Sequence, residues 1–428
     1  MERAPSEAAD ALGPYYFHNM LNFITFPRRH QLNAWSVLFV AALITFVVAC
    51  GASDNESPDE AGDGLITTQN SNPRVSQEPN ANVPIPDKTP GRGVPELTGL
   101  AGWINSEPFT IAERTSEGGV VLIDFWTYTC VNCIRTFSFL QDWNEKYADA
   151  SLTILGVHTP EFDFEMDRQG VLDSMERFGL EYPVAQDNER GTWTAFENGA
   201  WPAKYLFDSE GSLVYTHIGE GDYVETEQAI RTALTAAGRD LSGIAAGTNE
   251  GPVEDASAIH LTEELYAGYG KVYGLGGSIS IAPVEYYLGP DRVVEYTDPD
   301  FHHFDKVYLQ GPWLNEKDAI VHARSTTGLE DYIYALVFAR SANVVLEHRG
   351  ESPIEVFVEL DGGPVPVDGA GPDIEYDEAG RSLVRVDESR LYALLELPEY
   401  GQHELVIRSD SDRFAVSSFT FGNYLQGP

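Results

Sequence analysis

The stretch that decides the fold runs from Val120 to Arg135 and reads VVLIDFWTYTCVNCIR. Its first seven residues are mostly apolar and of strand type, and a short turn leads to Cys130 and Cys133, which two residues separate. A helical pattern then begins. A strand that leads into a Cys-x-x-Cys motif at the first turn of a helix is typical of a redox dithiol, because this spacing brings the two sulfurs within disulfide reach.

The start of a helix also favours the chemistry of the first cysteine. It directs unpaired backbone N–H groups and the positive end of the helix dipole at that sulfur. Both effects favour the thiolate, which is the nucleophile in thiol–disulfide exchange. We therefore expect Cys130 to attack a partner disulfide and Cys133, one turn further on, to resolve the mixed disulfide.

Composition limits the classes of partner. The chain has 428 residues, which is enough for about two or three domains. Its 67 acidic residues outnumber 27 basic ones, and the formal net charge is −40. This charge argues against nucleic acid or an anionic membrane surface as a partner and fits general solubility. The three cysteines are Cys50, Cys130 and Cys133, so none remains for a structural disulfide framework if Cys50 has another role.

The N-terminal region has the order of a secretory signal. An uncharged apolar run at residues 34–49 follows Arg28 and Arg29 and ends in Val-Val-Ala-Cys at Cys50. The run is shorter than the roughly 20 residues that a membrane span needs. Its end resembles the bacterial lipoprotein cleavage box, in which the cysteine takes lipid and becomes the mature N-terminus. We expect residues 1–50 to be this signal; an uncleaved anchor is the alternative.

The remaining chain divides by composition and periodicity. Residues 51–95 are rich in Ser, Asn, Asp, Pro and Gly and read as a disordered linker. Residues 96–240 alternate strand and helix patterns, including a short strand or hairpin from Trp103 to Arg114, and predict an α/β sheet. Residues 241–260 are a second linker. Residues 261–428 contain many short strands separated by turn residues, which predicts a β-sandwich.

Several motifs around the cysteines resemble the DipZ branch of the thioredoxin family. They are GVHTPEF at 156–162, YPVAQDN at 182–188, WPAKYLFD at 201–208 and GEGDY at 219–223. In addition, Asp124-Phe125-Trp126 stands before Cys130 with the spacing that thioredoxins use for their buried acid and aromatic pair. The segment between the strand at Leu152 and Trp201 is longer than in plain thioredoxin, and it is similar to the insertion of TlpA-like and DipZ-like extracytoplasmic members. The resemblance implies a thioredoxin-like domain in residues 96–240.

The C-terminal part resembles the same branch. The motifs are EYYLG at 285–289, LQGPW at 309–313, VELDG at 358–362 and FTFG at 419–422. The C-terminal domain of DipZ has a jelly roll like that of a carbohydrate-binding module. The resemblance therefore implies an all-β, carbohydrate-binding-module-like jelly roll or β-sandwich after the redox domain.

The resemblance also implies roles for residues near the dithiol. Pro202 matches the cis-proline of the family, which exposes the backbone of Trp201 for pairing with an extended client peptide. Asp124 would accept a proton behind the cysteines, with its pKa raised by burial. Trp126 and Tyr128 would shape the surface around the sulfurs and contact the client.

These expectations combine into a function. The protein is predicted to be a membrane-anchored extracytoplasmic lipoprotein, in the periplasm or at the cell surface, that reduces disulfides of client proteins. DipZ-like and TlpA-like relatives mostly receive electrons from a membrane carrier, so a separate donor of the CcdA/DsbD type is expected. Apocytochromes in cytochrome c biogenesis are possible clients by the same analogy. Neither a cofactor nor a metal is predicted, because the dithiol carries the electrons itself.

Two other functions stay open. Thr127 and Cys130 also satisfy the Thr-x-x-Cys pattern of peroxiredoxins, so a thiol peroxidase is one alternative, although the upstream proline of that motif is absent. The other is a cell-surface binding protein whose redox domain is vestigial. Measuring insulin-disulfide reduction, and its dependence on Cys130, separates the redox functions from the binding function.

The C-terminal part contains aromatic and histidine residues of types that bind ligands in other proteins. Trp313, Tyr286 and Tyr287 could stack on a sugar, but core packing is the favoured interpretation. His302-His303 with nearby Asp300 and Asp305 could suggest a metal, but no ligand spacing supports one and an exposed polar loop is favoured.

Overall fold

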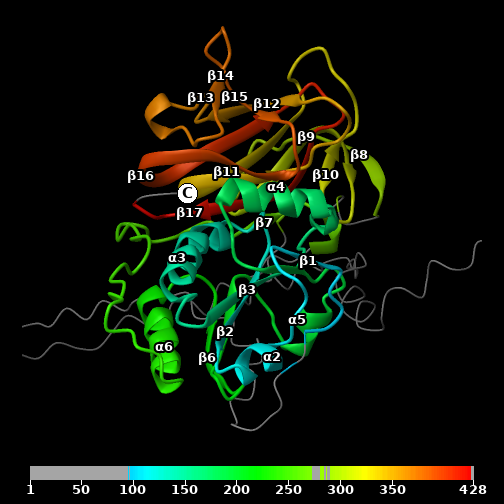
Figure 1. Ribbon diagram of the computed structural model, residues 1–428. Coiled ribbons are helices and arrows are strands. Elements are labelled where there is room, and N and C mark those ends of the chain that lie inside the picture. The colour runs from blue at the N-terminus through cyan, green and yellow to red at the C-terminus, as the bar shows by residue number, and fades with distance from the viewer. Residues whose placement is uncertain (1–94, 96, 272–279, 284–285, 287–289, 426–428) are drawn as a thin grey trace, which may run out of the picture. The chain divides into compact units, whose positions relative to one another are not determined.

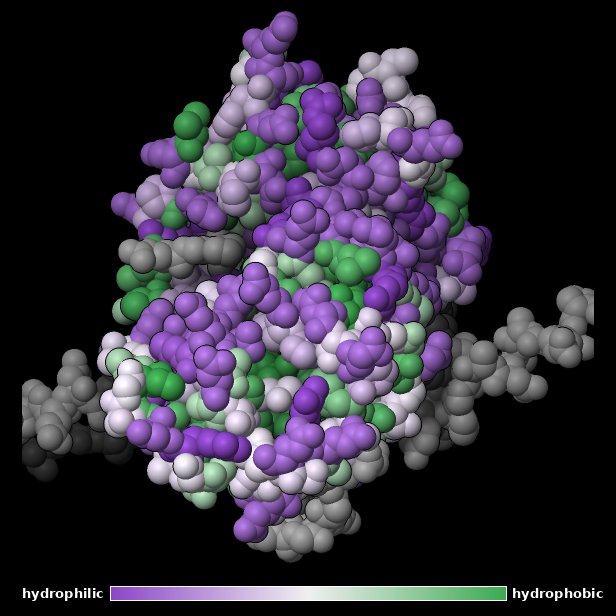
Figure 2. All heavy atoms as spheres, in the orientation of Figure 1, coloured by the Kyte–Doolittle hydropathy of each residue, from purple (hydrophilic) through white to green (hydrophobic). Residues whose placement is uncertain are grey.

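The computed structural model describes residues 95, 97–271, 280–283, 286 and 290–425 (Figure 1). The predicted signal, Cys50, almost all of the first linker and Tyr287 lie outside the described residues. Within the described part, no helix is both long and apolar enough to cross a membrane. The face seen in Figure 2 is mostly hydrophilic, with apolar residues in small scattered groups.

The redox domain is built on a six-stranded sheet with the order β1-β4-β3-β2-β5-β6. The strands are β1 Gly102–Ile104, β2 Val120–Trp126, β3 Leu152–His158, β4 Val184–Gln186, β5 Ala203–Phe207 and β6 Leu213–Ile218. Strand β2 is buried along its whole length and pairs parallel with β3 and antiparallel with β5. Burial on both faces explains why this strand is a nearly continuous apolar run.

Helices cover both faces of this sheet. They are α2 Ile111–Ser116, α3 Val131–Tyr147, η1 Asp163–Met166, α4 Arg168–Phe178, α5 Gly191–Ala195 and α6 Tyr223–Ala236, where η denotes a 3-10 helix. Helices α3, α4 and α6 share one core with the sheet, whereas α2 and α5 pack in the core on the other face. The fold is the thioredoxin-like α/β arrangement that the sequence predicts (Figure 1). Helix α3 begins directly after the first cysteine.

Helix α2 corrects one prediction. The stretch from Trp103 to Arg114 was expected to be a strand or hairpin, but only its first residues belong to β1. The helix begins because Thr110 and Glu113 form a capping box, in which Thr110 Oγ1 accepts from Glu113 N at 3.1 Å and Glu113 Oε2 accepts from Thr110 N at 2.7 Å. Reciprocal capping of this kind stabilises a helix start even when the helix is short.

The β domain is one hydrogen-bonded network of eleven strands. They are β7 Leu265–Tyr266, β8 Arg292–Tyr296, β9 Lys306–Asn315, β10 Ile320–His322, β11 Tyr332–Leu346, β12 Ile354–Leu360, β13 Gly363–Pro364, β14 Glu375–Tyr376, β15 Ser382–Val386, β16 Arg390–Arg408 and β17 Ala415–Gly422. Two 3-10 turns, η2 Tyr269–Lys271 and η4 Val367–Gly369, accompany them. The all-β composition predicted for this region is confirmed.

Strands β11 and β16 are longer than the sequence suggests. The sequence predicts only short strands in this region, but each of these two is long and continuous, with register shifts near Ser341 where the two strands pair. Bulges of this kind bend a strand without ending it. As a result the first half of β11 pairs with β9 and the second half pairs with β17.

The large aromatic residues of the β domain lie in its core. Trp313 is 1 % exposed and Tyr286 is fully buried. The core-packing interpretation of both residues is therefore confirmed, and neither side chain is available to stack on a sugar.

Candidate active site

The two predicted redox cysteines lie together at the start of α3. Cys130 is the N-cap residue, and its Sγ accepts a hydrogen bond from Cys133 N at 3.2 Å. The two Sγ atoms are 2.6 Å apart, and both residues are free cysteines. Cys130 is half-buried, whereas Cys133 is completely buried. The sulfur that a client can reach is therefore that of Cys130.

The buried sulfur is held as a thiol. Burial raises the pKa of the Cys133 thiol well above its ordinary value, and the hydrogen bond to Cys130 and the negative charge of Asp124 add to this effect. A buried thiol of this kind becomes a nucleophile only when a nearby group accepts its proton.

Asp124 is a buried acid whose negative charge acts on Cys133. It lies on β2 directly opposite Lys204 of β5, and Lys204 Nζ is 3.6 Å from Asp124 Oδ1. Both side chains are almost completely buried, and within the described residues neither the Asp124 carboxylate nor Lys204 Nζ has a hydrogen-bond partner. Burial raises the pKa of Asp124 to about 6, while the positive charge of Lys204 opposes this rise. The carboxyl group can therefore gain or lose a proton near neutral pH.

Lys204 is a residue that sequence reasoning missed. The signal was present, because a lysine in the otherwise apolar strand Ala203–Phe207 either breaks the strand pattern or is paired inside the protein. Its other cross-strand neighbour, His217 of β6, has a pKa lowered by burial and by the charge of Lys204. The row of Asp124, Lys204 and His217 thus crosses three adjacent strands.

Two predicted client-contact residues lie under the site instead of on its surface. Trp126 is completely buried, with its ring centroid 5.2 Å from that of Phe137 and 4.9 Å from that of His158. Tyr128 is 4 % exposed and stacks on His158 at 5.5 Å. The prediction that these rings face a client is therefore wrong in this structure, because the core that supports the turn before Cys130 encloses them.

Trp201 and Pro202 occupy a different loop. The peptide bond between them is cis, and Pro202 O accepts a hydrogen bond from Gly219 N at 2.8 Å. Trp201 is half-buried, and its indole Nε1 donates to Thr159 O at 3.0 Å. Its side chain is thus fixed while part of it stays accessible, so a client-contact role for Trp201 stays a prediction.

An ion pair next to the dithiol was also missed. Arg135 Nε donates to both carboxylate oxygens of Glu220, at 2.9 and 3.0 Å, and Arg135 Nη2 donates to Asn132 Oδ1 at 2.6 Å. The ring of Tyr424, from the end of the β domain, lies 4.6 Å from the guanidinium carbon. Because these contacts join residues up to 289 positions apart (424 minus 135), the local sequence pattern carries no sign of them.

Parts of the chain are similar to known proteins. Residues 262–422 match the family described as "Thioredoxin like C-terminal domain". Over 188 residues the chain is 39 % identical to Protein DipZ of Mycobacterium bovis, a match that covers 43 % of this chain and 26 % of that protein. The chain thus resembles DipZ-like proteins of the thioredoxin family over this part of its length. It spans about a quarter of the length of the mycobacterial proteins that it matches.

Two smaller proteins are also similar. The chain is 28 % identical over 141 residues to thiol-disulfide oxidoreductase YkuV of Bacillus subtilis, covering 33 % of this chain and 93 % of that protein. A solved structure of a putative thiol:disulfide interchange protein DsbE from Chlorobium tepidum is 22 % identical, with a TM-score of 0.30, and the match covers 34 % of this chain and 98 % of that one.

The peroxidase alternative depends on Thr127. This residue is completely buried, and its Oγ1 lies 3.4 Å from His158 Nε2. A threonine that polarises a peroxide must present its hydroxyl group beside the reactive sulfur. The hydroxyl of Thr127 is instead enclosed in the core, so the structure gives this alternative no support.

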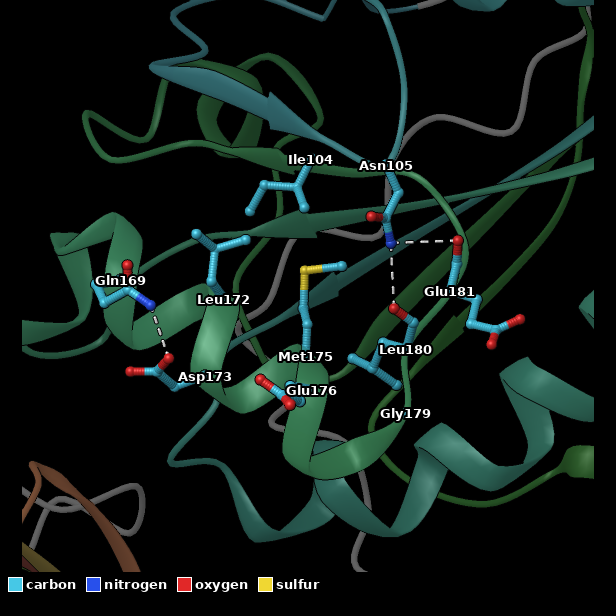
Figure 3. Close-up of a pocket in the computed structure, with 10 residues that line it drawn as sticks. All are labelled: Ile104, Asn105, Gln169, Leu172, Asp173, Met175, Glu176, Gly179, Leu180 and Glu181. Atoms are coloured by element: carbon cyan, nitrogen blue, oxygen red, sulfur yellow. Dashed lines mark hydrogen bonds between the residues drawn. The ribbon is translucent and has the colours of Figure 1, made fainter.

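A hollow in the described part lies away from the two cysteines. It has a volume of about 510 Å³ and lies between α4 and the end of β1 (Figure 3). Its lining residues are Ile104, Asn105, Gln169, Leu172, Asp173, Met175, Glu176, Gly179, Leu180 and Glu181. Neither cysteine is among them, so the hollow is separate from the dithiol.

His302, in the polar loop of the β domain, contacts a neighbouring acid and a neighbouring ring. His302 Nε2 lies 2.8 Å from Asp298 Oδ1, and its ring stacks on Tyr334 at 4.0 Å. Among the described residues, no group of three or more His, Cys, Asp or Glu side chains is arranged to hold a metal ion.

Proposed function

We propose that the protein is an extracytoplasmic, membrane-tethered thiol–disulfide oxidoreductase that reduces disulfides of client proteins through Cys130 and Cys133. The observation that carries this proposal is the placement of a half-buried Cys130 sulfur, at the start of α3, 2.6 Å from the sulfur of a completely buried Cys133. The named similarity to thiol-disulfide oxidoreductases supports the same reaction class.

The geometry supports a two-step exchange. The Cys130 thiolate attacks one sulfur of the client disulfide, and the other client sulfur leaves as a thiolate that takes a proton. Asp124 then accepts the proton of Cys133, and the Cys133 thiolate attacks the Cys130 sulfur. The second client sulfur leaves as a thiolate and takes a proton from the solvent, to which Asp124 later returns the proton of Cys133. The client disulfide gains two electrons and two protons, and Cys130 and Cys133 become a disulfide that a separate reductant must reopen.

The buried ion pair supports the second step. In isolation, a carboxyl group buried this deeply would stay protonated at neutral pH and could not accept a proton. Lys204 lowers the pKa of Asp124 toward the working pH, where a general base is most effective. We assign Asp124 as the proton acceptor. We assign Lys204 as the residue that lowers the pKa of Asp124, so that the carboxylate form is available to accept a proton.

Tethering and electron supply complete the proposal. Lipid on Cys50 would anchor the protein, and residues 51–95 would act as a flexible linker whose average span is on the order of 35–40 Å. A membrane carrier of the CcdA/DsbD type would reopen the Cys130–Cys133 disulfide. Apocytochromes awaiting haem attachment are the proposed clients.

We also propose that residues 261–428 form a carbohydrate-binding-module-like jelly roll. The bent strands β11 and β16 support this assignment, because long strands that change pairing partners along their length are used at the corners of two-layer β structures. Since Trp313 and Tyr286 are buried, sugar stacking on these two residues plays no part in the proposal.

Insulin-disulfide reduction by the full chain in detergent tests the redox function. We expect wild-type protein to reduce insulin and Cys130→Ser to lose this activity. Cys133→Ser should accumulate a mixed disulfide with the client, because the resolving thiol is absent. The control variant Cys50→Ala should stay active in detergent but leave the membrane fraction of cells. An inactive wild-type protein, or activity that survives Cys130→Ser, contradicts the redox function. Either result favours a binding protein, and binding of the chain to a glycan array would then test that function.

A further inference from the structure

Glu165 is a completely buried acid that the exchange reaction does not use. It lies in η1, and its two carboxylate oxygens contact different segments of the chain. Oε1 accepts from Thr129 N at 3.2 Å and from Thr129 Oγ1 at 2.7 Å. Oε2 accepts from Glu161 N at 2.6 Å and from Phe162 N at 3.0 Å. One carboxylate therefore joins two loops.

The first loop leads into the nucleophile. Thr129 immediately precedes Cys130, whose backbone N–H donates to Thr127 O at 3.4 Å. Cys130 O then accepts the first hydrogen bond of α3, from Ile134 N at 3.0 Å. Because Glu165 holds both the N–H and the hydroxyl of Thr129, it fixes the peptide on the N-terminal side of the reactive sulfur.

The second loop, residues 160–164, is called here the docking loop because it contacts the β domain. Glu161 Oε1 accepts from Tyr266 OH and from Lys271 Nζ, both at 2.7 Å. Phe162 packs in a small apolar cluster with Tyr266 and Val345. Asp163 N donates to an oxygen of Asp318 at 3.0 Å. Glu165 therefore holds the backbone of the segment that the β domain contacts.

The chemistry of this position requires a carboxylate. Each carboxylate oxygen accepts two hydrogen bonds, so the group acts as an acceptor in all four contacts. A glutamine could accept at only one of its two terminal atoms, and its NH2 group would face two further donors. Burying a charged carboxylate carries a large desolvation cost, which a purely structural contact between two loops does not need. This cost points to a role beyond packing.

We propose that Glu165 is a positioning residue that couples contact between the β domain and the docking loop to the reactivity of the Cys130–Cys133 pair. The inference rests on the proposed redox function. When the β domain holds the docking loop, the carboxylate holds Thr129 and keeps the first sulfur beside the second. When that contact loosens, the turn before Cys130 relaxes and the sulfurs meet less often. The β domain thus regulates the dithiol instead of acting only as a separate binding module.

The coupling has an expected sign. Pinning the turn raises the effective concentration of one thiol near the other, and this favours the disulfide over the dithiol. Glu165→Gln should therefore shift the equilibrium with glutathione toward the dithiol by about tenfold, which corresponds to about 30 mV for a two-electron couple. The variant protein would be a weaker reductant than the wild type.

A double-mutant cycle on the full chain tests the coupling. Tyr266→Phe removes the hydroxyl that donates to Glu161 and changes no atom of the redox domain. We expect it to shift the glutathione equilibrium about threefold in the wild-type background and not at all when Glu165 is already Gln. Tyr205→Phe is the matched control, because it removes another buried hydroxyl, bonded to Asn198 at 3.1 Å, and should leave the equilibrium unchanged.

Thr129→Val provides a second test if Glu165→Gln folds poorly. It removes only the hydroxyl contact and should shift the equilibrium in the same direction by a smaller factor. A purely structural Glu165 would lower the unfolding midpoint while leaving the glutathione equilibrium unchanged, and additive shifts in the cycle would likewise overturn the proposal. The unchanged equilibrium and the additive shifts count against the proposal only if the wild-type protein is active. If the wild type fails to reduce insulin, the proposed redox function itself is wrong.

Discussion

Two buried aspartates, one in each domain, show how surroundings decide the role of an acid. Asp124 of the redox domain lies 3.6 Å from Lys204 and accepts no hydrogen bond from any described residue. Asp331 of the β domain accepts from His322 Nε2 at 2.8 Å and from two nitrogens of Arg324 at 2.7 Å. Both side chains are at most 2 % exposed.

The pKa values of these groups move in opposite directions. Burial raises the pKa of Asp124 to about 6, because a cation without hydrogen bonds only partly offsets desolvation. Burial also acts on Asp331, but the hydrogen bonds from Arg324 and His322 hold its pKa below the ordinary value. A charged partner alone leaves an acid free to exchange its proton, whereas bonded partners fix it as an anion. The first acid suits proton transfer and the second suits structure.

Removing the exchangeable acid should have the largest effect. Asp124→Asn takes away the proton acceptor for Cys133, so resolution of the mixed disulfide should slow on the order of 10³-fold at pH 7. Stopped-flow measurement of client release reports this step. Asp331→Asn is the matched control and should keep the wild-type rate. A rate within a factor of three of wild type in Asp124→Asn would remove Asp124 from the mechanism.

Removing the bonded acid should affect stability instead. Asp331→Asn loses charged hydrogen bonds and leaves His322 buried without its partner, so the free energy of unfolding should fall by about 3 kcal/mol. Because the folded-state pKa of Asp331 is lowered, its stabilisation is complete above about pH 4 and is lost as the pH falls through that folded-state value. Urea unfolding of wild type and variant should therefore differ at pH 7 and converge in acid. An equal difference at both pH values would contradict this account.

Changing the cation should shift the pH profile. The rate of resolution in wild type should fall as the pH drops through about 6, because Asp124 then becomes protonated. Lys204→Met removes the charge that lowers this pKa, so the midpoint should move to higher pH. The rate at pH 7 should fall by less than about tenfold and recover at higher pH, because a general base acts only when it is deprotonated. Lys204→Arg, which keeps the charge, is the control; the same profile in all three proteins would argue against the pairing.

An exposed ion pair should have the smallest effect. Lys317 Nζ lies 2.7 Å from Asp163 Oδ1, but both side chains are more than half exposed. Lys317→Met should therefore change the free energy of unfolding by less than about 1 kcal/mol and leave the resolution rate unaltered. A larger loss of stability in urea would show that this contact between the domains is stronger than its exposure indicates.

The sequence predicts best what lies close together along the chain. The Cys-x-x-Cys spacing, the apolar run of β2 and the start of α3 are all local, and the structure has the strand and the helix within the expected bounds. The burial of Asp124 also follows from its place inside an apolar run. The cysteine roles and the client contact of Trp201 stay predictions.

The contacts that could not be predicted from the sequence join distant parts of the chain. Glu165 meets Thr129 across 36 positions, and Arg135 meets Glu220 across 85. No short motif encodes such contacts. The misplaced Trp126 has a related cause, because strand alternation does not show which aromatic side chains the later segments enclose. Each error concerns three-dimensional neighbours and not the type of element.

The complete burial of Cys133 has a consequence for oxidative damage. Of the two sulfurs of the dithiol, a peroxide can reach only that of Cys130 and would convert it to a sulfenic acid. With Cys133 Sγ 2.6 Å away, condensation to a disulfide with loss of water competes with further oxidation. Formation of the irreversible sulfinic and sulfonic acids is thereby reduced, and under the proposed function the reductant that reopens the disulfide would also reverse the damage.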